Sequence, residues 1–254
     1  MNRAAMNAAN DEFFVVIRSA QERSLPLCVN AVQAQTGNFT AIEEYPFLNA
    51  VRKTFELGAQ QEHPFLLALD ADVILYPNAL DTILEDARVF LREEPLLLCL
   101  DFQVKDKFRG RVLAGGHLYV NKYAKELASH FERLADDPLQ SRPERSNLLA
   151  FANARYLLIV NNSREVGLHD YEQYYNHLYV KYYRRAIRWP EYIAANLAAV
   201  EQLRYLHPDD LDLEVVLESL KAGMGKKEVP FDARLYPSIE QLMGISEKSL
   251  LLKA

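Results

Sequence analysis

The sequence predicts an α/β protein in which a mostly parallel sheet is flanked by helices and is followed by an α-helical C-terminal region. Two observations predict this fold. Over residues 13–169, short apolar runs rich in β-branched and aromatic residues alternate with segments of helical periodicity. From about residue 170 onward, the apolar patterns are helical. Because such alternation is typical of parallel strands joined by helical crossovers, we expect helices on both faces of the sheet.

The strands are predicted by apolar runs and the helices by their starts and stops. Strands are expected at residues 13–18, 64–70, 95–102 and 111–120, with shorter ones within 38–45 and 156–160. Ser24 and Pro26 suit the start of the first helix, and Gly37 suits its end. Further helices are expected at residues 46–58, from residue 77, and at residues 122–134, 170–189, 191–206 and 209–224. We therefore expect a flexible tail (1–12), an α/β domain (13–169) and a helical extension packed on it (170–254).

The composition limits the class of protein. Half of the 254 residues are apolar, which permits a sizeable core without disulfides, and Cys28 and Cys99 lie in apolar segments as buried free thiols would. The net charge of -6 argues against binding to a nucleic-acid backbone. The N-terminus lacks a signal-peptide core, and no run approaches the ~20 apolar residues of a membrane span. We expect a cytoplasmic protein, with peripheral contact at the inner face of a membrane left open.

Two carboxylates, Asp70 and Asp72, come at the end of the strand predicted over residues 64–70. In an open α/β sheet, ligands bind beyond the carboxyl ends of the strands. Like charges so close repel each other unless a cation lies between them, and carboxylate oxygens suit Mg²⁺ or Mn²⁺. The alternative interpretation is that Asp70 caps the next turn and Asp72 is a solvated loop residue.

Three segments together resemble the GT-A glycosyltransferases, in the broad family-2-like group. They are the opening strand, loop and helix "VVIRSAQERSLPLCVNAVQAQ", the strand with its D-x-D "FLLALDADVILYPNALDTIL", and the glycine-containing "LAGGHLYVNKYAKEL". The resemblance covers roughly residues 13–185. It departs from the family in the loop at residues 18–23, where family members usually carry a Pro and an Asn or Asp.

The resemblance implies a Rossmann-like GT-A fold and a metal-dependent glycosyltransferase that uses Mn²⁺ or Mg²⁺. Such an enzyme moves a sugar from a UDP-, GDP- or CMP-linked donor to a glycan or other hydroxyl acceptor, for instance in cell-surface polysaccharide or glycoconjugate synthesis. Asp72 would be the main metal ligand, and Asp70 would contact the ribose or reach the metal through water. The residues that the resemblance places at the nucleotide-sugar are Arg18, Ser19, Glu22, Asp70, Gly115 and Gly116.

A second group of candidate residues lies 97 positions beyond Asp72, in the pair His169-Asp170. GT-A enzymes commonly complete the metal shell with a downstream His or Asp, and a neutral imidazole can ligate Mn²⁺. His169 is therefore a candidate ligand, and Asp170 a ligand, a catalytic carboxylate or only a helix cap. An inverting transferase also needs a base near the acceptor hydroxyl. The candidates are Asp170, Asp101 and Glu144, the last in a polar loop predicted at residues 141–147; His117 fits an acceptor pocket but reads more readily as structural.

The helix predicted at residues 170–189 carries a basic group near its end. Its members are Lys181, Arg184, Arg185 and Arg188. A solvated helix end is the favoured interpretation, because cations are stabilised there by the helix dipole. The alternative interpretation is that these side chains neutralise a diphosphate, an anionic lipid or a polysaccharide.

Two other functions stay open at this point. A haloacid-dehalogenase-like Mg²⁺-dependent phosphatase also ends an apolar strand with D-x-D, and Asp209-Asp210 resembles its late acidic pair. That family's strand normally comes first in the domain, and its Thr two residues after the second Asp is replaced here by Ile74. The other alternative is a glycosyltransferase-like binding module without catalytic activity.

Overall fold

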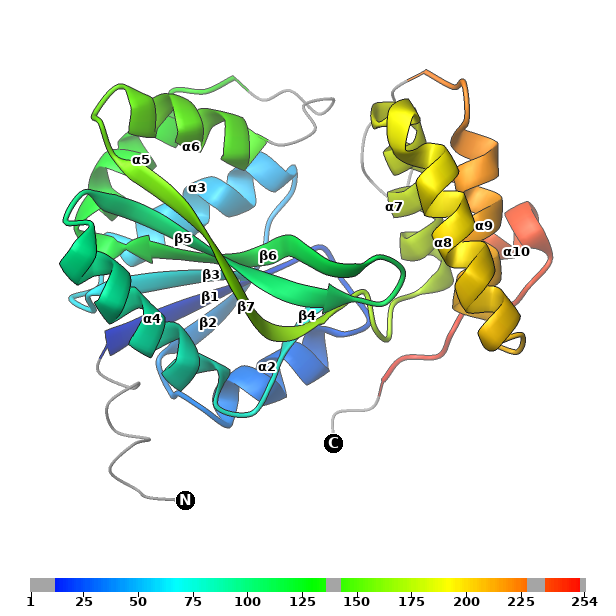
Figure 1. Cartoon of the computed structure of the whole chain (residues 1–254), viewed down its shortest axis with the longest axis horizontal. Coiled ribbons are helices and arrows are strands. Elements are labelled where there is room, and N and C mark those ends of the chain that lie inside the picture. Colours follow the sequence, from blue (N-terminus) through cyan, green and yellow to red (C-terminus); the bar gives the residue numbers. More distant parts are fainter. Residues whose placement is uncertain (1–11, 136–142, 228–235, 252–254) are drawn as a thin grey trace.

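The computed structural model describes residues 12–135, 143–227 and 236–251. The tail expected at residues 1–12 lies outside this part of the chain, apart from Glu12. Figure 1 shows a sheet with helices on both faces and a separate group of C-terminal helices beside one end of it.

The sheet has seven strands in the order β2-β1-β3-β6-β5-β7-β4. The strands are β1 (Phe13–Ser19), β2 (Phe39–Glu43), β3 (Phe65–Asp70), β4 (Val73–Leu75), β5 (Leu97–Asp106), β6 (Gly110–Val120) and β7 (Leu158–His169). β1 pairs in parallel with β2 and β3, and β5 pairs in parallel with β7. The other three pairings, β3 with β6, β5 with β6 and β4 with β7, are antiparallel.

The expectation of a mostly parallel sheet is therefore wrong, because the sheet is mixed. β5 and β6 are joined by the three residues 107–109, and so short a connection permits only an antiparallel pair. The glycines at 115 and 116 do not interrupt β6, which runs from Gly110 to Val120. β6 lies between the two parallel blocks, β2-β1-β3 on one side and β5-β7 on the other.

Helices cover both faces of the sheet, as the sequence predicts. Because side chains alternate along β1, Phe13, Val15 and Ile17 belong to one apolar cluster, and Phe14 and Val16 to the other. The first cluster is completed by α2 (Leu25–Gln33) and α4 (Ala79–Glu93). The second is completed by α3 (Phe47–Gly58), α5 (Ala124–Glu132) and α6 (Pro143–Asn153). Residues 143–147, expected in a loop, form the first turns of α6, and both cysteines are buried free thiols.

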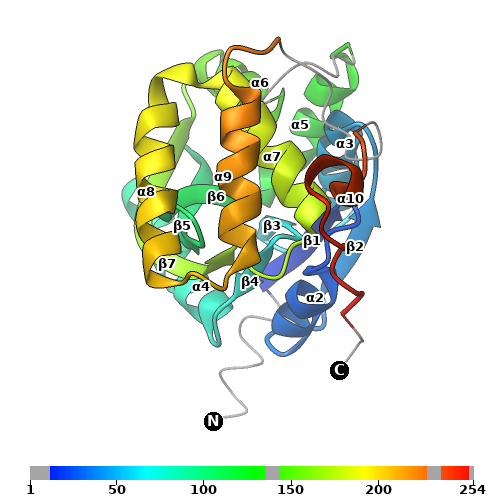
Figure 2. The ribbon, with the colours of Figure 1, turned by 90° about the vertical axis from the view of Figure 1, so that its right-hand side faces the viewer.

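The C-terminal region is helical and has an apolar core of its own. It contains α7 (Tyr175–Arg188), α8 (Ile193–Leu206), α9 (Leu211–Gly223) and the short α10 (Ile239–Met243). Phe108, at the tip of the β5–β6 hairpin, is fully buried in this core. α9 packs closely on α7, since a Cβ at Gly223 would lie 2.4 Å from the carbonyl oxygen of Tyr183. Figure 2 shows α8 and α9 in front of α7.

Among the described residues, no helix combines the length and the apolar character that crossing a membrane requires.

Candidate functional site

Two pairs of strands bring the predicted site residues to one edge of the sheet. β1 and β3 are parallel, and their register places Arg18 beside Asp70. β4 and β7 are antiparallel, with Val73 opposite His169, and the backbone N–H of Asp170 donates to the carbonyl of Asp72 at 3.2 Å. These contacts bring Asp72 next to the His169-Asp170 pair.

The first group of charged residues, the Asp72 cluster, consists of Asp72, Asp106, His169, Asp170 and Lys181. The Lys181 ammonium, which comes from α7, lies at its centre. Its Nζ donates to Asp72 Oδ2 at 2.8 Å and to Asp170 Oδ1 at 2.6 Å, and lies 3.2 Å from His169 Nε2. Asp170 is fully buried, and its other oxygen accepts from the hydroxyl of Tyr182 at 3.2 Å.

Asp106 orients the imidazole of His169. His169 Nδ1 lies 2.8 Å from Asp106 Oδ2, and Asp106 is itself held by the backbone N–H of Phe108 and by the guanidinium of Arg109. With Nδ1 bound in this way, Nε2 faces Asp72 Oδ2 at 3.3 Å. Burial disfavours the imidazolium, but neighbouring carboxylates outweigh it and raise the pKa of His169 to about 9. A carboxylate behind a histidine is the arrangement that fixes a metal-ligating imidazole.

The Asp72 cluster has the donor groups that a divalent ion needs. One ligand atom from each of Asp72, His169 and Asp170 lies within 4.8 Å of the others, and two carboxylates with an imidazole suit Mn²⁺ or Mg²⁺. Asp72 Oδ1 is buried and has no hydrogen-bond partner among the described residues. Burial disfavours the Asp72 carboxylate, but Lys181 and His169 outweigh it and hold its pKa well below the usual range. These residues fit a divalent ion, and Lys181 touches the same donor groups.

The second group, the Arg18 cluster, lies on the other side of the D-x-D segment. Its members are Arg18, Asp70, Cys99, Asp101, His117, Tyr119, Glu144 and Arg145. Arg18 is buried, and its Nε and Nη2 lie 2.8 and 2.7 Å from Asp70 Oδ1. Its Nη1 donates to Glu144 Oε1 at 2.7 Å, which also accepts from the hydroxyl of Tyr119 at 2.7 Å. Burial disfavours the charged form of Glu144, yet Arg18 outweighs it and lowers the pKa of the carboxyl.

His117 and Asp101 form a hydrogen-bonded pair within the Arg18 cluster. His117 Nδ1 lies 2.7 Å from Asp101 Oδ1, and Asp101 also binds Arg145. The His117 side chain is 21% exposed, and its Nε2 lies 4.0 Å from Glu144 Oε2. Burial opposes protonation of His117, but the carboxylates of Glu144 and Asp101 outweigh it and raise its pKa. His117 therefore presents an ionisable nitrogen at the partly exposed side of the Arg18 cluster, with Asp70 and Arg145.

The two carboxylates of the D-x-D belong to different clusters. Asp70 pairs with Arg18, and Asp72 pairs with Lys181. Asp70 is not in the group of described side chains that could together hold one ion, whereas Asp72, His169 and Asp170 are. Of the predicted metal ligands, the structure thus brings Asp72 and His169 together, joined by the alternative candidate Asp170, and pairs Asp70 with Arg18 instead.

Ser19 and Glu22, predicted at the nucleotide, contact each other in the loop after β1. The Ser19 hydroxyl and the backbone N–H of Ala20 both donate to Glu22 Oε2, at 2.9 and 2.6 Å. Burial, and to a smaller extent the charge of Asp72, raise the pKa of Glu22 to about 7. This loop therefore lies within electrostatic reach of the Asp72 cluster.

The two predicted glycines have different surroundings. Gly115 has a positive φ of 63°, and a Cβ there would lie 2.9 Å from Val73 Cγ2 and 3.1 Å from Asp70 Cβ. A Cβ at Gly116 would meet nothing within 4 Å. Position 115 needs a glycine because β6 passes directly against the D-x-D segment.

Sequence reasoning assigned Lys181 to a solvated helix end, which is not where its ammonium lies. The signal for a charged partner is the position of Lys181 three residues after the buried Leu178 and directly before the buried Tyr182. Asp106 and Arg109 were not singled out, because "KDKFRG" has no pattern that distinguishes it from an ordinary turn.

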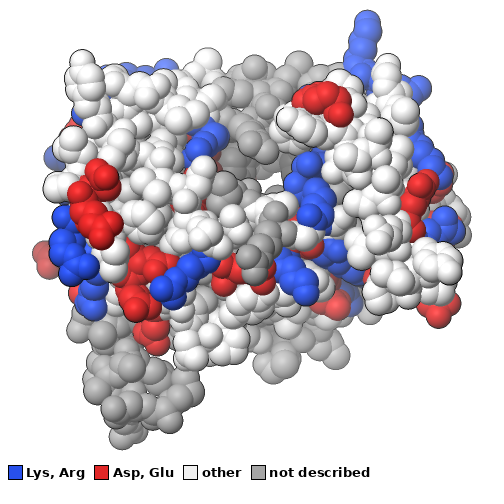
Figure 3. Space-filling model, viewed as in Figure 1, with Lys and Arg blue, Asp and Glu red and all other residues white. Residues whose placement is uncertain are grey.

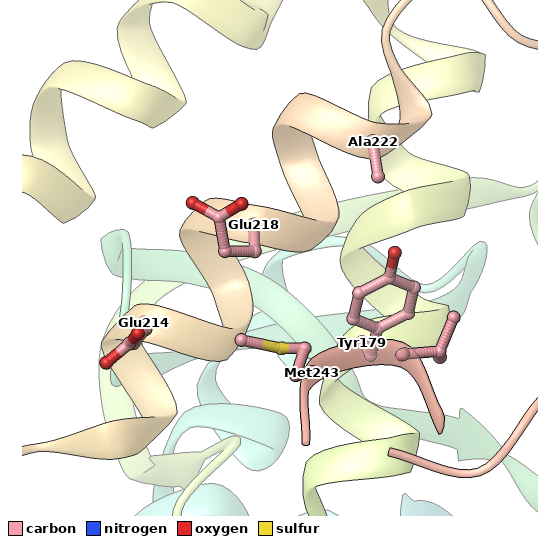
Figure 4. A pocket seen from close by; sticks show the side chains of 6 residues that line it. Tyr179, Glu214, Glu218, Ala222 and Met243 are labelled. Atoms are coloured by element: carbon pink, nitrogen blue, oxygen red, sulfur yellow. The ribbon is translucent and has the colours of Figure 1, made fainter. Parts of the chain in front are cut away.

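Other surface features lie apart from the two clusters. A pocket of about 310 Å³ between α7, α9 and α10 shares no residue with them (Figure 4). It is lined by Tyr179, Glu214, Glu218, Ala222, Leu242 and Met243. On the face shown in Figure 3, acidic and basic side chains are interspersed.

No protein-family model matches the chain, and a comparison with curated proteins found no match. Among solved structures, it is similar to a glycosyltransferase involved in the glycosylation of the major capsid of PBCV-1, with 11% identity and a TM-score of 0.43, over 62% of this chain and 92% of that one. It is also similar to 4-diphosphocytidyl-2C-methyl-D-erythritol synthase from Anaerococcus prevotii, with 10% identity and a TM-score of 0.43, over 65% and 91%. A third is S. aureus TarS 1-349, with 12% identity and a TM-score of 0.41, over 84% and 71%. Structural similarity of this degree does not assign an activity to the chain. The chemistry of the site is therefore inferred from the chain's own residues.

Proposed function

We propose that the chain is a nucleotide-sugar-dependent glycosyltransferase whose donor site lies between the Asp72 and Arg18 clusters. One observation carries this proposal: Asp72, His169 and Asp170 converge at the carboxyl end of β3, directly beside the Arg18–Asp70 pair. Ligands of open α/β sheets bind at such strand ends. A site of this kind combines donors for a divalent ion with fixed cations, which suits a substrate that carries a diphosphate.

In this proposal, Asp72, His169 and Asp170 hold Mn²⁺ or Mg²⁺. The ion, when bound, neutralises charge on the departing diphosphate. Arg18 and Asp70 line the donor site on the side of β1. The loop that carries Ser19 and Glu22 contacts the nucleotide on the same side. The nucleotide of the donor is UDP or GDP, each of which departs as a diphosphate; a CMP-linked donor, which releases a monophosphate, is the alternative. The acceptor is a glycan or another hydroxyl compound of the kind found in cell-surface glycoconjugates.

The base for the acceptor hydroxyl is proposed to be His117. Asp170, Asp101 and Glu144 were the candidates from sequence, but each is buried and hydrogen-bonded to a cation. His117 is more exposed than these carboxylates, and its Nε2 can accept a proton while Nδ1 is held by Asp101. Asp101 then acts as a positioning residue, because it holds Nδ1 and leaves Nε2 to face the acceptor.

One observation favours an inactive binding module as the second candidate. Lys181 already compensates Asp72 and Asp170, so the cluster is stable without an added ion. A module of this kind would bind a nucleotide-sugar without cleaving it.

The test is a thermal-shift and calorimetric screen of UDP-, GDP- and CMP-linked sugars with and without Mn²⁺. We expect one nucleotide class to bind in the presence of Mn²⁺, and Asp72→Asn to lose that binding. Asp81→Asn, an exposed aspartate on α4, is the matched control and should bind as the wild type does.

Three outcomes would contradict the transferase. The first is that no donor binds under any condition. The second is that a donor binds but its sugar is never released, even to water, which identifies the binding module. The third is metal-dependent hydrolysis of p-nitrophenyl phosphate without any nucleotide binding, which identifies a phosphatase.

A further inference from the structure

Lys181 occupies the centre of the group that would hold the ion. Its Nζ contacts Asp72 Oδ2, Asp170 Oδ1 and His169 Nε2 at 2.8, 2.6 and 3.2 Å. These are one atom from each of the three residues that could together ligate a metal. The ammonium is therefore already at the position where a cation is best compensated.

The remaining donor atoms of these residues cannot form a separate site. Asp170 Oδ2 accepts from Tyr182, and His169 Nδ1 is bound to Asp106. Asp72 Oδ1 is the buried atom without a hydrogen-bond partner among the described residues, and a single oxygen does not make a metal site. An ion held by all three residues must use His169 Nε2, which Lys181 now contacts, since Nδ1 is bound to Asp106.

Lys181 can leave these atoms without displacing the helix that carries it. Its side chain is 31% exposed, whereas that of Asp72 is 16% exposed and Asp170 is fully buried. A lysine carries its charge on a flexible four-carbon stem, so rotation about that stem can move the ammonium towards solvent. The backbones of Asp72 and Asp170, in contrast, are joined by a hydrogen bond directly beyond the β4–β7 pairing.

We propose that Lys181 and a divalent ion exclude each other at Asp72, His169 and Asp170, so that Lys181 sets the affinity of the site for the ion. In the protein without an ion, Lys181 keeps the carboxylates together. When the ion binds, Lys181 is released, and on the proposed function its ammonium then faces the diphosphate of the donor. The C-terminal helices thereby control a site built by the sheet.

The proposal is tested by titrating Mn²⁺ alone into the full chain, with the free ion measured by electron paramagnetic resonance. Competition of this kind is a negative coupling, for which about 5- to 150-fold is typical. We expect Lys181→Met to bind Mn²⁺ about 10- to 100-fold more tightly than the wild type. Lys125→Met, which removes an exposed lysine of α5, is the matched control and should leave the affinity unchanged.

A second measurement on the wild type covers the case in which Lys181→Met does not fold. Acetic anhydride labelling with mass spectrometry should show more acetylation of Lys181 when Mn²⁺ is present than when it is absent, with Lys125 unchanged. Equal Mn²⁺ affinity in wild type and Lys181→Met, or labelling of Lys181 that does not respond to Mn²⁺, overturns the proposal. Failure of both proteins to bind Mn²⁺ overturns it as well, while donor binding without metal would leave the transferase standing.

Discussion

Replacing Arg18 by Met should destabilise the protein strongly, because Arg18 compensates two carboxylates in the interior. Arg18 is 3% exposed, and its partner Glu144 is 7% exposed. Removing one partner of a buried ion pair typically costs about 3 to 5 kcal/mol, since the other charge is left without compensation. Asp70 is 29% exposed at its side chain and can be rehydrated, so we expect the lower part of this range, about 3 to 4 kcal/mol. For a chain of this length, that loss lowers the melting temperature by roughly 10 °C.

A second substitution separates the electrostatic cause from a packing defect. Glu144→Gln removes the uncompensated charge and keeps an oxygen that can accept from Tyr119. We therefore expect the double variant Arg18→Met/Glu144→Gln to be more stable than Arg18→Met by about 1 to 2 kcal/mol, as a coupled pair should be. Glu144→Gln alone should destabilise the protein, because it weakens the bond to Arg18.

Urea unfolding followed by circular dichroism measures these free energies from the midpoint and slope of each transition. A loss below about 1 kcal/mol for Arg18→Met would refute a buried compensating role. Losses that simply add in the double variant would show that Arg18 and Glu144 are not energetically coupled.

Four further predictions concern the residues of β5, β6 and the loop after β1. Gly115→Ala should cost about 1 to 3 kcal/mol in urea unfolding, since its φ is positive and β6 leaves no room for a Cβ, whereas Gly116→Ala should be nearly neutral; equal effects would contradict this. Burial raises the pKa of Glu22 from 4.5 to about 7, so the folded state retains a proton that the unfolded state has lost, and stability falls as pH rises from 4.5 to 7. Glu22→Gln should therefore gain stability relative to the wild type above pH 7 but not below pH 4.5, by about 2 to 3 kcal/mol at most; a gain at both pH values would contradict this. His117→Gln should slow sugar release from the donor at least ~100-fold with donor affinity unchanged. Asp101→Asn should move the acidic limb of the pH–rate profile to lower pH, because Asp101 raises the pKa of His117, and an unmoved limb would remove Asp101 from that role.

The strands and helices of the α/β part were predictable because their buried apolar side chains recur along the sequence at the spacing of a strand or of a helix face. β1 is apolar on both faces: Phe13, Val15 and Ile17 lie in one apolar cluster, and Phe14 and Val16 lie in the other. A continuous apolar run in the sequence predicts a strand that is buried on both faces. The direction of β6 was not predictable in the same way. An apolar strand between two others has the same pattern whether it is parallel or antiparallel, and the three-residue turn before Gly110 decides the matter.

By itself, the sequence determined that two carboxylates come at the end of an apolar strand, and it offered His169-Asp170 as candidates to complete a cation site. The tertiary structure alone decided how these charges are compensated. Asp70 pairs with Arg18 across the β1–β3 register, and Asp72 pairs with Lys181 from 109 positions away. The physical reason is that a buried carboxylate must be compensated by whichever cation the fold brings within contact, and contact between distant segments is set by packing rather than by local pattern.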